Sequence, residues 1–184
     1  MRVVGGRFKG RSLAGPRSQA IRPTSDRLRE TLFNILAHRF DLPRPQTRAL
    51  DLIAGTGALA LEALSRGAAY AVMIETGTEG RGLIRENVEA LGLAGATKIF
   101  RRDATKLGPA GTIAPFDLIF CDPPYGKGLG EKALASALAG GWMAPGGVAV
   151  LEERAGAQIS LPDGLTILDR RQAGDTQLVF AKAA

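Results

Sequence analysis

The pattern of apolar and polar positions changes near residue 47 of this 184-residue chain. Before it, residues 24–40 carry apolar side chains at Leu28, Leu32, Ile35 and Leu36, which is the spacing of one face of an amphipathic helix. Thr24 or Ser25 is placed to cap that helix. The first residues, 1–13, contain short apolar runs around Gly5, Gly6 and Gly10, which predict a small β-hairpin.

After residue 47, short apolar runs alternate with helical patterns. The runs predict strands at 48–54, 70–75, 97–103, 116–122 and 146–153, and the segments between them predict helices at 58–67, 78–93 and 130–143. Residues 165–183 predict a terminal antiparallel hairpin. Strands that alternate with helices form a parallel, doubly wound sheet, so we expect a seven-stranded Rossmann-like α/β domain over residues 47–184. Residues 1–46 are then a hairpin-and-helix extension.

The net charge of +6 lies entirely in the first thirty residues. These contain eight basic side chains and two acidic ones, whereas residues 31–184 contain sixteen of each. Seven of the eight basic residues are arginines, whose planar fork suits phosphate and stacking on bases. A basic extension on a neutral domain predicts binding to a polyanion, with a solvated basic surface as the alternative.

The rest of the composition narrows the function classes. A single cysteine, Cys121, excludes an internal disulfide and is typical of a reducing cytoplasm. No apolar run is long enough to span a membrane, and the N-terminus has no signal-peptide core. His38 and Cys121 are the only residues of their types, so a zinc site is not expected. We expect a cytoplasmic monomer without metal or membrane contacts.

The loop after the first strand of the sheet predicts a nucleoside site. In "DLIAGTGALALEA", Gly55 and Gly57 lie between the strand and the following helix, where a backbone without Cβ atoms can approach a ligand. Glu75 ends the next strand and can accept hydrogen bonds from two ribose hydroxyls. Asp103 ends the third strand, within reach of an adenine amino group. An NAD-dependent dehydrogenase and an S-adenosylmethionine-dependent methyltransferase both fit this pattern.

The segment after the fourth strand distinguishes these two readings. "FCDPPYGK" places an acid, two prolines and an aromatic at the carboxyl end of a buried strand. Asp122 and the Pro123 carbonyl can accept both N–H bonds of an exocyclic amine, which directs its lone pair toward a methyl donor. Pro124 helps to fix the direction of that carbonyl, and Tyr125 offers a flat face on which a base can stack. A dehydrogenase has no use for this arrangement.

Several segments in the same order resemble one bacterial family. They are "RVVGGRFKGRSL", "IRPTSDRLRETLFNIL", "DLIAGTGALALEALSRGA", "LIRENVEAL", "DPPY" and "GDTQLVF", and they extend over nearly the whole chain. Together they resemble the RsmD family, the 16S rRNA (guanine(966)-N(2))-methyltransferases. The resemblance implies a class I methyltransferase fold, S-adenosylmethionine as methyl donor and S-adenosylhomocysteine as product. It also implies a guanine N2 amine of small-subunit rRNA, in a partly assembled 30S particle, as substrate.

The resemblance and the loop patterns together give a set of expected site residues. Catalysis is expected from Asp122, Pro123, Pro124 and Tyr125. Cofactor binding is expected from Asp51, Ala54, Gly55, Thr56, Gly57, Glu75, Asp103, Ala104, Phe33 and Asn34. RNA contacts are expected from Arg7, Lys9, Arg11, Arg22, Arg27 and Arg29.

Three other functions remain open at this stage. An adenine-N6 methyltransferase of RNA or DNA would use the same Asp-Pro-Pro-Tyr segment, although the "RPT" block argues against it. A protein glutamine methyltransferase typically has Asn at the position of Asp122 and needs no basic extension. A non-catalytic RNA-binding module would lose nothing when Asp122 is replaced by alanine, whereas an enzyme should lose most of its rate.

Overall fold

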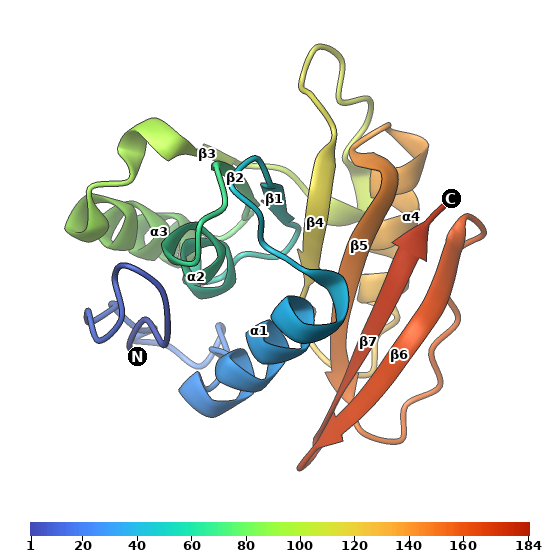
Figure 1. Cartoon of the computed structure of the whole chain (residues 1–184), viewed down its shortest axis with the longest axis horizontal. Coiled ribbons are helices and arrows are strands. Elements are labelled where there is room, and N and C mark those ends of the chain that lie inside the picture. The colour runs from blue at the N-terminus through green and yellow to red at the C-terminus, as the bar shows by residue number, and fades with distance from the viewer.

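The computed structural model describes all 184 residues and contains one seven-stranded sheet (Figure 1). Its strand order is β3-β2-β1-β4-β5-β7-β6. The first five strands of that order are parallel, and β7 runs antiparallel to both β5 and β6. The strands are β1 Arg48–Asp51, β2 Tyr70–Ile74, β3 Thr97–Phe100, β4 Phe116–Cys121, β5 Met143–Arg154, β6 Leu165–Ala173 and β7 Thr176–Ala183. The predicted α/β class and C-terminal hairpin are confirmed.

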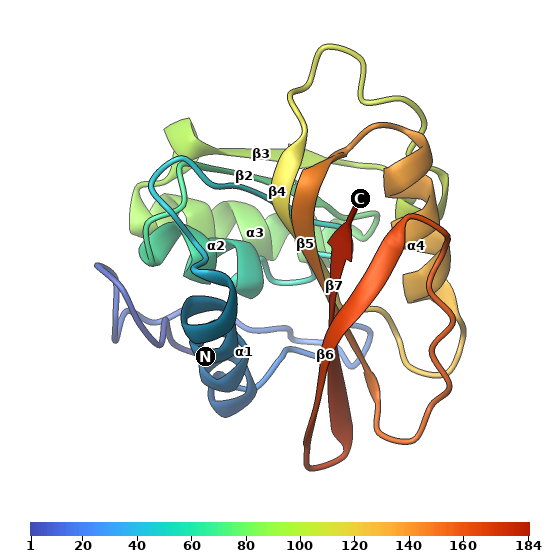
Figure 2. The ribbon, with the colours of Figure 1, turned by 45° about the vertical axis from the view of Figure 1, so that its right-hand side comes forward.

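Helices cover both faces of the sheet, as the two views in Figures 1 and 2 show. The helices are α1 Asp26–Phe40, α2 Ala58–Ser65, α3 Thr78–Leu91 and α4 Leu129–Ala139, with short 3₁₀ turns η1 Ala94–Ala96 and η2 Ala104–Lys106. Apolar side chains of α1, α2 and α3 share one core with one face of the sheet. Those of α4 and η2 share a second core with the opposite face. This is the two-sided burial expected of a doubly wound sheet.

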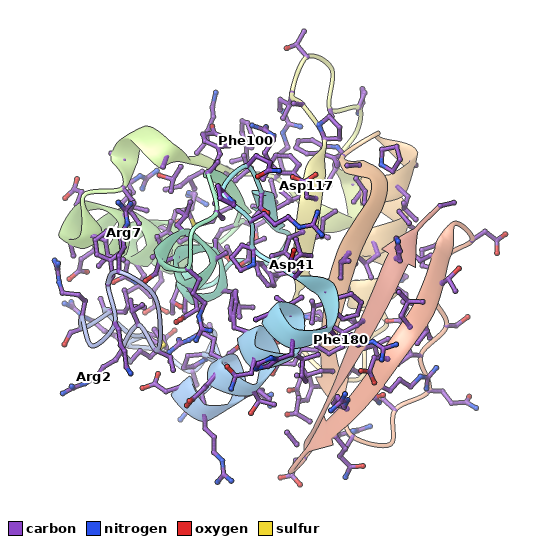
Figure 3. The ribbon with its side chains drawn as sticks, viewed as in Figure 1. Arg2, Arg7, Asp41, Phe100, Asp117 and Phe180 are labelled. Atoms are coloured by element: carbon purple, nitrogen blue, oxygen red, sulfur yellow. The ribbon has the colours of Figure 1, made fainter.

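Helix α1 belongs to the same core as the sheet. Ser25 caps its N-terminus by accepting a hydrogen bond from the Leu28 amide. The Phe33 ring lies 5.6 Å from the Phe120 ring of β4, and the Phe40 ring lies 5.6 Å from Phe180 of β7, which is labelled in Figure 3. Helix α1 is therefore packed against the sheet, and the expected division at residue 46 stays a prediction.

The predicted N-terminal hairpin is present only as a short antiparallel pairing of residues 1–3 with residues 10–13, and the turn between them is docked on α2. It contains a single bridge between Arg2 and Ser12, and Gly6 and Gly10 curl the chain at positive φ. Glu62 of α2 accepts hydrogen bonds from the amides of Val4 and Gly5, both at 2.9 Å. The Val3 and Leu13 amides donate to the carbonyls of Arg11 and Met1, whereas the Arg7 amide donates to the Ser65 carbonyl of α2. The backbone is therefore satisfied partly across the turn and partly on α2, which keeps the hairpin short.

The topology brings the functional loops together. Strand β1 pairs in parallel with both β2 and β4, so the strand order reverses at β1. The loops after β1, β2 and β4 leave the same edge of the sheet at this switch point, where ligands bind in open α/β folds.

Candidate active site

A cavity of about 450 Å³ opens at the carboxyl ends of the parallel strands. Its wall combines the loop before α1 with the loops after β1, β2 and β4. The lining residues are Gln19, Ala20, Ile21, Arg22, Pro23, Thr24, Ile53, Ala54, Gly55, Thr56, Ala58, Leu59, Glu75, Thr76, Asp122, Pro123, Pro124 and Tyr125. The predicted nucleoside loop and the Asp-Pro-Pro-Tyr segment therefore face one space.

The loop after β1 needs its glycines for two different reasons. Gly55 lies in the cavity wall at φ +59°, where the left-handed backbone favours glycine. Gly57 begins α2 at φ +82°, and a Cβ there would come within 3.2 Å of Met73 Sδ and 3.3 Å of Ile84 Cγ1. Gly55 keeps the cavity open, whereas Gly57 lets α2 pack closely on the sheet.

Glu75 joins the first two loops of the cavity. One of its carboxylate oxygens accepts a hydrogen bond from the Gly55 amide and the other from the Gly77 amide, both at 2.8 Å. The side chain is half-buried in the cavity wall. Each carboxylate oxygen has a second lone pair, so Glu75 can still accept hydrogen bonds from a ligand in the cavity.

Asp122 follows β4 and is held by a neighbouring carboxyl group. Its Oδ2 accepts a hydrogen bond from the Thr24 hydroxyl at 2.9 Å, and the same hydroxyl lies 3.2 Å from Glu152 Oε2. Burial raises the pKa of Asp122 well above its usual range, and the nearby Glu152 charge raises it further. Asp122 thus belongs to a carboxyl pair that holds a proton more tightly than an isolated aspartate would.

Tyr125 is fixed at both its ring and its hydroxyl. The hydroxyl lies 2.9 Å from Glu152 Oε1 and 3.0 Å from Thr176 Oγ1. Burial, more than any other effect, raises the pKa of Tyr125 to about 12, so the phenol is neutral at physiological pH. The Arg22 guanidinium lies 3.9 Å from the ring centroid. One face of the ring predicted to stack on a base is therefore covered by an arginine.

Asp51 ends β1 behind the cavity. It is 1% exposed, and its Oδ1 has no hydrogen-bond partner in the protein. Burial raises its pKa to about 7, against a hydrogen bond from the Ile53 backbone that lowers it. The predicted cofactor role of Asp51 stays a prediction, because the side chain lies outside the cavity lining.

Six predicted cofactor residues do not line this cavity: Asp51 and Gly57, described above, and Phe33, Asn34, Asp103 and Ala104. Phe33 is fully buried against Phe120 and is a core residue, and Asn34 is exposed on α1. Asp103 caps η2 by accepting hydrogen bonds from the amide and hydroxyl of Thr105, and Ala104 is buried in the core on the α4 side of the sheet. The cofactor roles of these four residues therefore stay predictions that the cavity lining does not support.

The predicted RNA-binding residues divide into exposed and buried ones. Five are exposed: Arg7, Lys9, Arg11, Arg22 and Arg27. Figure 3 labels Arg7 on the N-terminal loop, where it lies 4.5 Å from the Phe8 ring centroid.

Arg29 is the exception among the basic residues, and its prediction as an RNA contact is wrong. Its side chain is 0% exposed and is paired with Asp26 and with Glu62, which lies 3.6 Å away. It also donates a hydrogen bond to the Arg2 carbonyl. Arg29 therefore fastens the N-terminal loop to α1 and α2 and cannot reach a phosphate.

Two residues of the site were not assigned to it from the sequence. The sequence predicts Thr24 only as a candidate helix cap, yet its hydroxyl contacts Asp122. Glu152 is 3% exposed and contacts Thr24, Tyr125 and, at 3.9 Å, Arg22. A possible signal for Glu152 was its position: an acid at the carboxyl end of the strand next to β4, in "AVLEE".

Two further structural findings concern metal-ligand clusters and membrane-spanning helices. No three or more His, Cys, Asp or Glu side chains are grouped as metal ligands would be. None of the helices combines the length and the apolar character needed to cross a bilayer.

Comparison with known proteins identifies the family. A profile of the family described as conserved hypothetical protein 95 matches residues 1–182. The ribosomal RNA small subunit methyltransferase D of Escherichia coli K12 is 39% identical over 144 residues, which are 78% of this chain and 70% of that protein. The protein of the same name from Haemophilus influenzae is 30% identical over 176 residues, 95% of this chain and 89% of that protein.

Solved structures agree with the sequence relatives. The putative methyltransferase yhhF from Escherichia coli superimposes with a TM-score of 0.82 at 31% identity, over 100% of this chain and 97% of that chain. A hypothetical protein from Thermus thermophilus superimposes with a TM-score of 0.74 at 32% identity, over 98% of each chain. The predicted resemblance is confirmed, and the chain belongs to the RsmD family of methyltransferases.

Proposed function

We propose that this protein transfers a methyl group from S-adenosylmethionine to the exocyclic N2 amine of a guanine in 16S rRNA. The observation that carries the proposal is the shared cavity: a glycine loop and Glu75 line one part of it, and Asp122, Pro123 and Tyr125 line another. Family membership supports the reaction class and the RNA substrate.

The residues present fit an adenosyl ligand. Gly55 removes a side chain from the cavity wall at a left-handed position, and Glu75 presents a half-buried carboxylate with unused lone pairs beside it. We expect Ala54, Gly55, Thr56 and Glu75 to hold the nucleoside part. S-adenosylmethionine supplies there a methyl group on a positively charged sulfur, which is open to attack by a nucleophile.

The chain's own contribution is to make a poor nucleophile reactive. The guanine amine shares its lone pair with the ring, and hydrogen bonds to Asp122 and to the Pro123 carbonyl turn that lone pair out of the ring plane. The prolines fix the direction of the carbonyl, and the Thr24 hydroxyl holds Asp122 through a hydrogen bond of 2.9 Å. Prealigned acceptors lower the barrier because they need no reorganisation during the reaction.

The exposed arginines and Lys9 are proposed to position the RNA. Their charges give affinity through phosphates, whereas the cavity selects the base. The base must leave its stack to enter, as RNA bases in loops and bulges do readily. We further propose a partly assembled 30S particle as substrate and a cytoplasmic monomer as the active form.

The experiment replaces Asp122 by alanine. The proposal predicts at least about a 100-fold loss of methyl transfer with unchanged affinity for S-adenosylmethionine, measured by calorimetry, because the acceptor acts in the transition state. Asp163→Ala, on an exposed loop far along the chain, is the matched control and should keep wild-type rates. Full activity of Asp122→Ala would reject the proposal.

A further inference from the structure

Glu152 is the residue of the site for which family membership and the Asp-Pro-Pro-Tyr segment give no role. Strands β4 and β5 are parallel neighbours, and their last registered pair is Cys121 with Leu151. The next residue of each strand is Asp122 on one and Glu152 on the other. The sheet itself therefore places two carboxyl groups side by side, one in the cavity wall and one buried behind it.

Glu152 is buried and contacts three other residues of the site, Thr24, Tyr125 and Arg22. It is 3% exposed, yet its two oxygens lie 3.2 Å from the Thr24 hydroxyl and 2.9 Å from the Tyr125 hydroxyl. Arg22 is its nearest cation, at 3.9 Å, with a side chain that is 65% exposed. A buried carboxylate with so loose an ion pair is costly unless it shares a proton.

The position of Thr24 is a second reason to expect a shared proton between Asp122 and Glu152. Its hydroxyl carries one hydrogen, yet it lies within hydrogen-bond distance of Asp122 Oδ2 and Glu152 Oε2. If one carboxyl group is protonated, the hydroxyl donates to one and accepts from the other. If both are ionised, one of the two contacts is left without a hydrogen, and two like charges lie next to each other.

We propose that Glu152 is a positioning residue for methyl transfer: it shares one proton with Asp122, and takes that proton when the amine binds, so that Asp122 is a correctly aimed, ionised acceptor. This inference rests on the proposed function. The amine nitrogen then bonds to the methyl carbon as the carbon–sulfur bond breaks, and the bonding electron pair stays on sulfur. The extra proton on nitrogen passes to Asp122 and leaves to water, so charge and atoms balance.

Other titratable groups face the pair. Asp51 lies at the end of β1, Cys121 precedes Asp122, and Arg22 and Tyr125 cover the cavity side. Glu153 points elsewhere, since its Oε1 accepts hydrogen bonds from the amides of Gly126 and Arg154. It is a buried acid one residue away and provides a matched control.

The first test is kinetic and compares Glu152→Gln with Glu152→Ala. Glutamine keeps the shape and can donate a hydrogen bond to Asp122, as a protonated glutamate does. We expect Glu152→Gln to keep kcat within about threefold and to lose the alkaline decline of the wild-type pH profile, and Glu152→Ala to lose about 100-fold in kcat. Equal inactivity of both variants, or full activity of Glu152→Ala, would overturn the proposal.

The second test needs neither RNA nor catalysis. Carbon-13 NMR of the aspartate carboxyl groups, with Asp122→Asn and Asp51→Asn for assignment, follows the titration of Asp122 directly. The proposal expects the Asp122 midpoint to fall by at least one pH unit in Glu152→Gln and to stay within about 0.3 units in Glu153→Gln. An unchanged midpoint in Glu152→Gln would refute the shared proton. If the wild type instead fails to methylate rRNA while this titration behaves as expected, the proposed function is at fault and the carboxyl pair is not.

Discussion

The Arg22 guanidinium lies 3.9 Å from the centroid of the Tyr125 ring. The two residues come from different loops of the cavity, one before α1 and the other after β4. An arginine over an aromatic face is stabilising, and it occupies a face on which a flat base could otherwise stack. Stacking of a guanine on this face therefore requires Arg22 to move, and a phosphate of the incoming RNA is a suitable new partner for it.

Two substitutions at Tyr125 separate the roles of its ring and its hydroxyl. Tyr125→Phe keeps the stacking surface and loses the contacts to Glu152 and Thr176, so we expect a loss of kcat/KM within about tenfold. Tyr125→Ala also removes the ring and should lose about 100-fold or more, since base stacking is worth about 1–3 kcal/mol. Steady-state kinetics with rRNA measure both. Equal losses in the two variants would show that the hydroxyl, and not stacking, is what matters.

Asp51 predicts a pH dependence of stability. Its pKa is raised from 3.8 to about 7 in the folded protein, so the folded state binds this proton more tightly than the unfolded state. Protonated Asp51 therefore adds to the free energy of unfolding. That contribution is fully present below pH 3.8 and is lost as the pH rises through about 7. Asp51→Asn should therefore gain stability over the wild type as pH rises, by up to about 4 kcal/mol at pH 8.

Urea unfolding of both proteins between pH 4 and pH 8 measures this difference. The exposed Asp163→Asn is the control and should follow the wild type throughout. A difference between Asp51→Asn and the wild type that does not change with pH would contradict the raised pKa.

Two glycines of the N-terminal loop, Gly6 and Gly10, test whether this loop is docked on α2, because they share a backbone conformation but differ in their neighbours. Gly6 and Gly10 both have positive φ, at +78° and +87°. A Cβ on Gly6 would lie 2.0 Å from the Ser65 carbonyl oxygen, whereas one on Gly10 would have nothing within 4 Å. Gly10→Ala should cost about 1 kcal/mol for its backbone alone, and Gly6→Ala at least about 2 kcal/mol more. Thermal unfolding measures both costs, and equal costs would mean that the loop is not docked on α2.

Substitutions of Arg27 and Arg29 should have opposite effects on stability and RNA binding, although the two residues are only two positions apart on α1. Arg27 is exposed, so Arg27→Ala should leave stability unchanged, weaken RNA binding and lower the salt dependence of binding by about one counterion. Arg29→Met leaves Glu62 without one of its buried partners and should cost about 3–5 kcal/mol of stability. Salt-dependent binding isotherms and urea unfolding test the two claims. A stable Arg29→Met variant that binds RNA poorly would restore the original prediction for Arg29.

The order of the elements was predictable because period and length identify each one. The buried face of α1 was predictable only in part. The four residues of the predicted stripe, Leu28, Leu32, Ile35 and Leu36, all pack on the core, but Arg29 and Phe33 are buried as well. The burial of an arginine is favourable because Glu62 and Asp26 pair with it, and no local pattern contains the contact with Glu62.

The residues of the site also divide into those that the sequence predicts and those that it does not. Gly55, Glu75 and the segment from Asp122 to Tyr125 were predictable, because each follows a parallel strand and such strand ends meet at one edge. Glu152 was not, because β5 continues past it to Arg154 and no loop marks its position. Only the register of β4 against β5 places it beside Asp122. Asp103 follows a strand too, but it uses its carboxylate to cap η2.

The most direct test of the central claim is the identity of the methylated product. The purified protein is incubated with labelled S-adenosylmethionine and, separately, naked 16S rRNA, partly assembled 30S particles, duplex DNA and total protein. Nuclease digestion and chromatography then identify the labelled nucleoside. The account predicts N2-methylguanosine from the small-subunit RNA, absent with Asp122→Ala and present with Asp163→Ala. Label recovered as N6-methyladenosine, or in protein only, would contradict it.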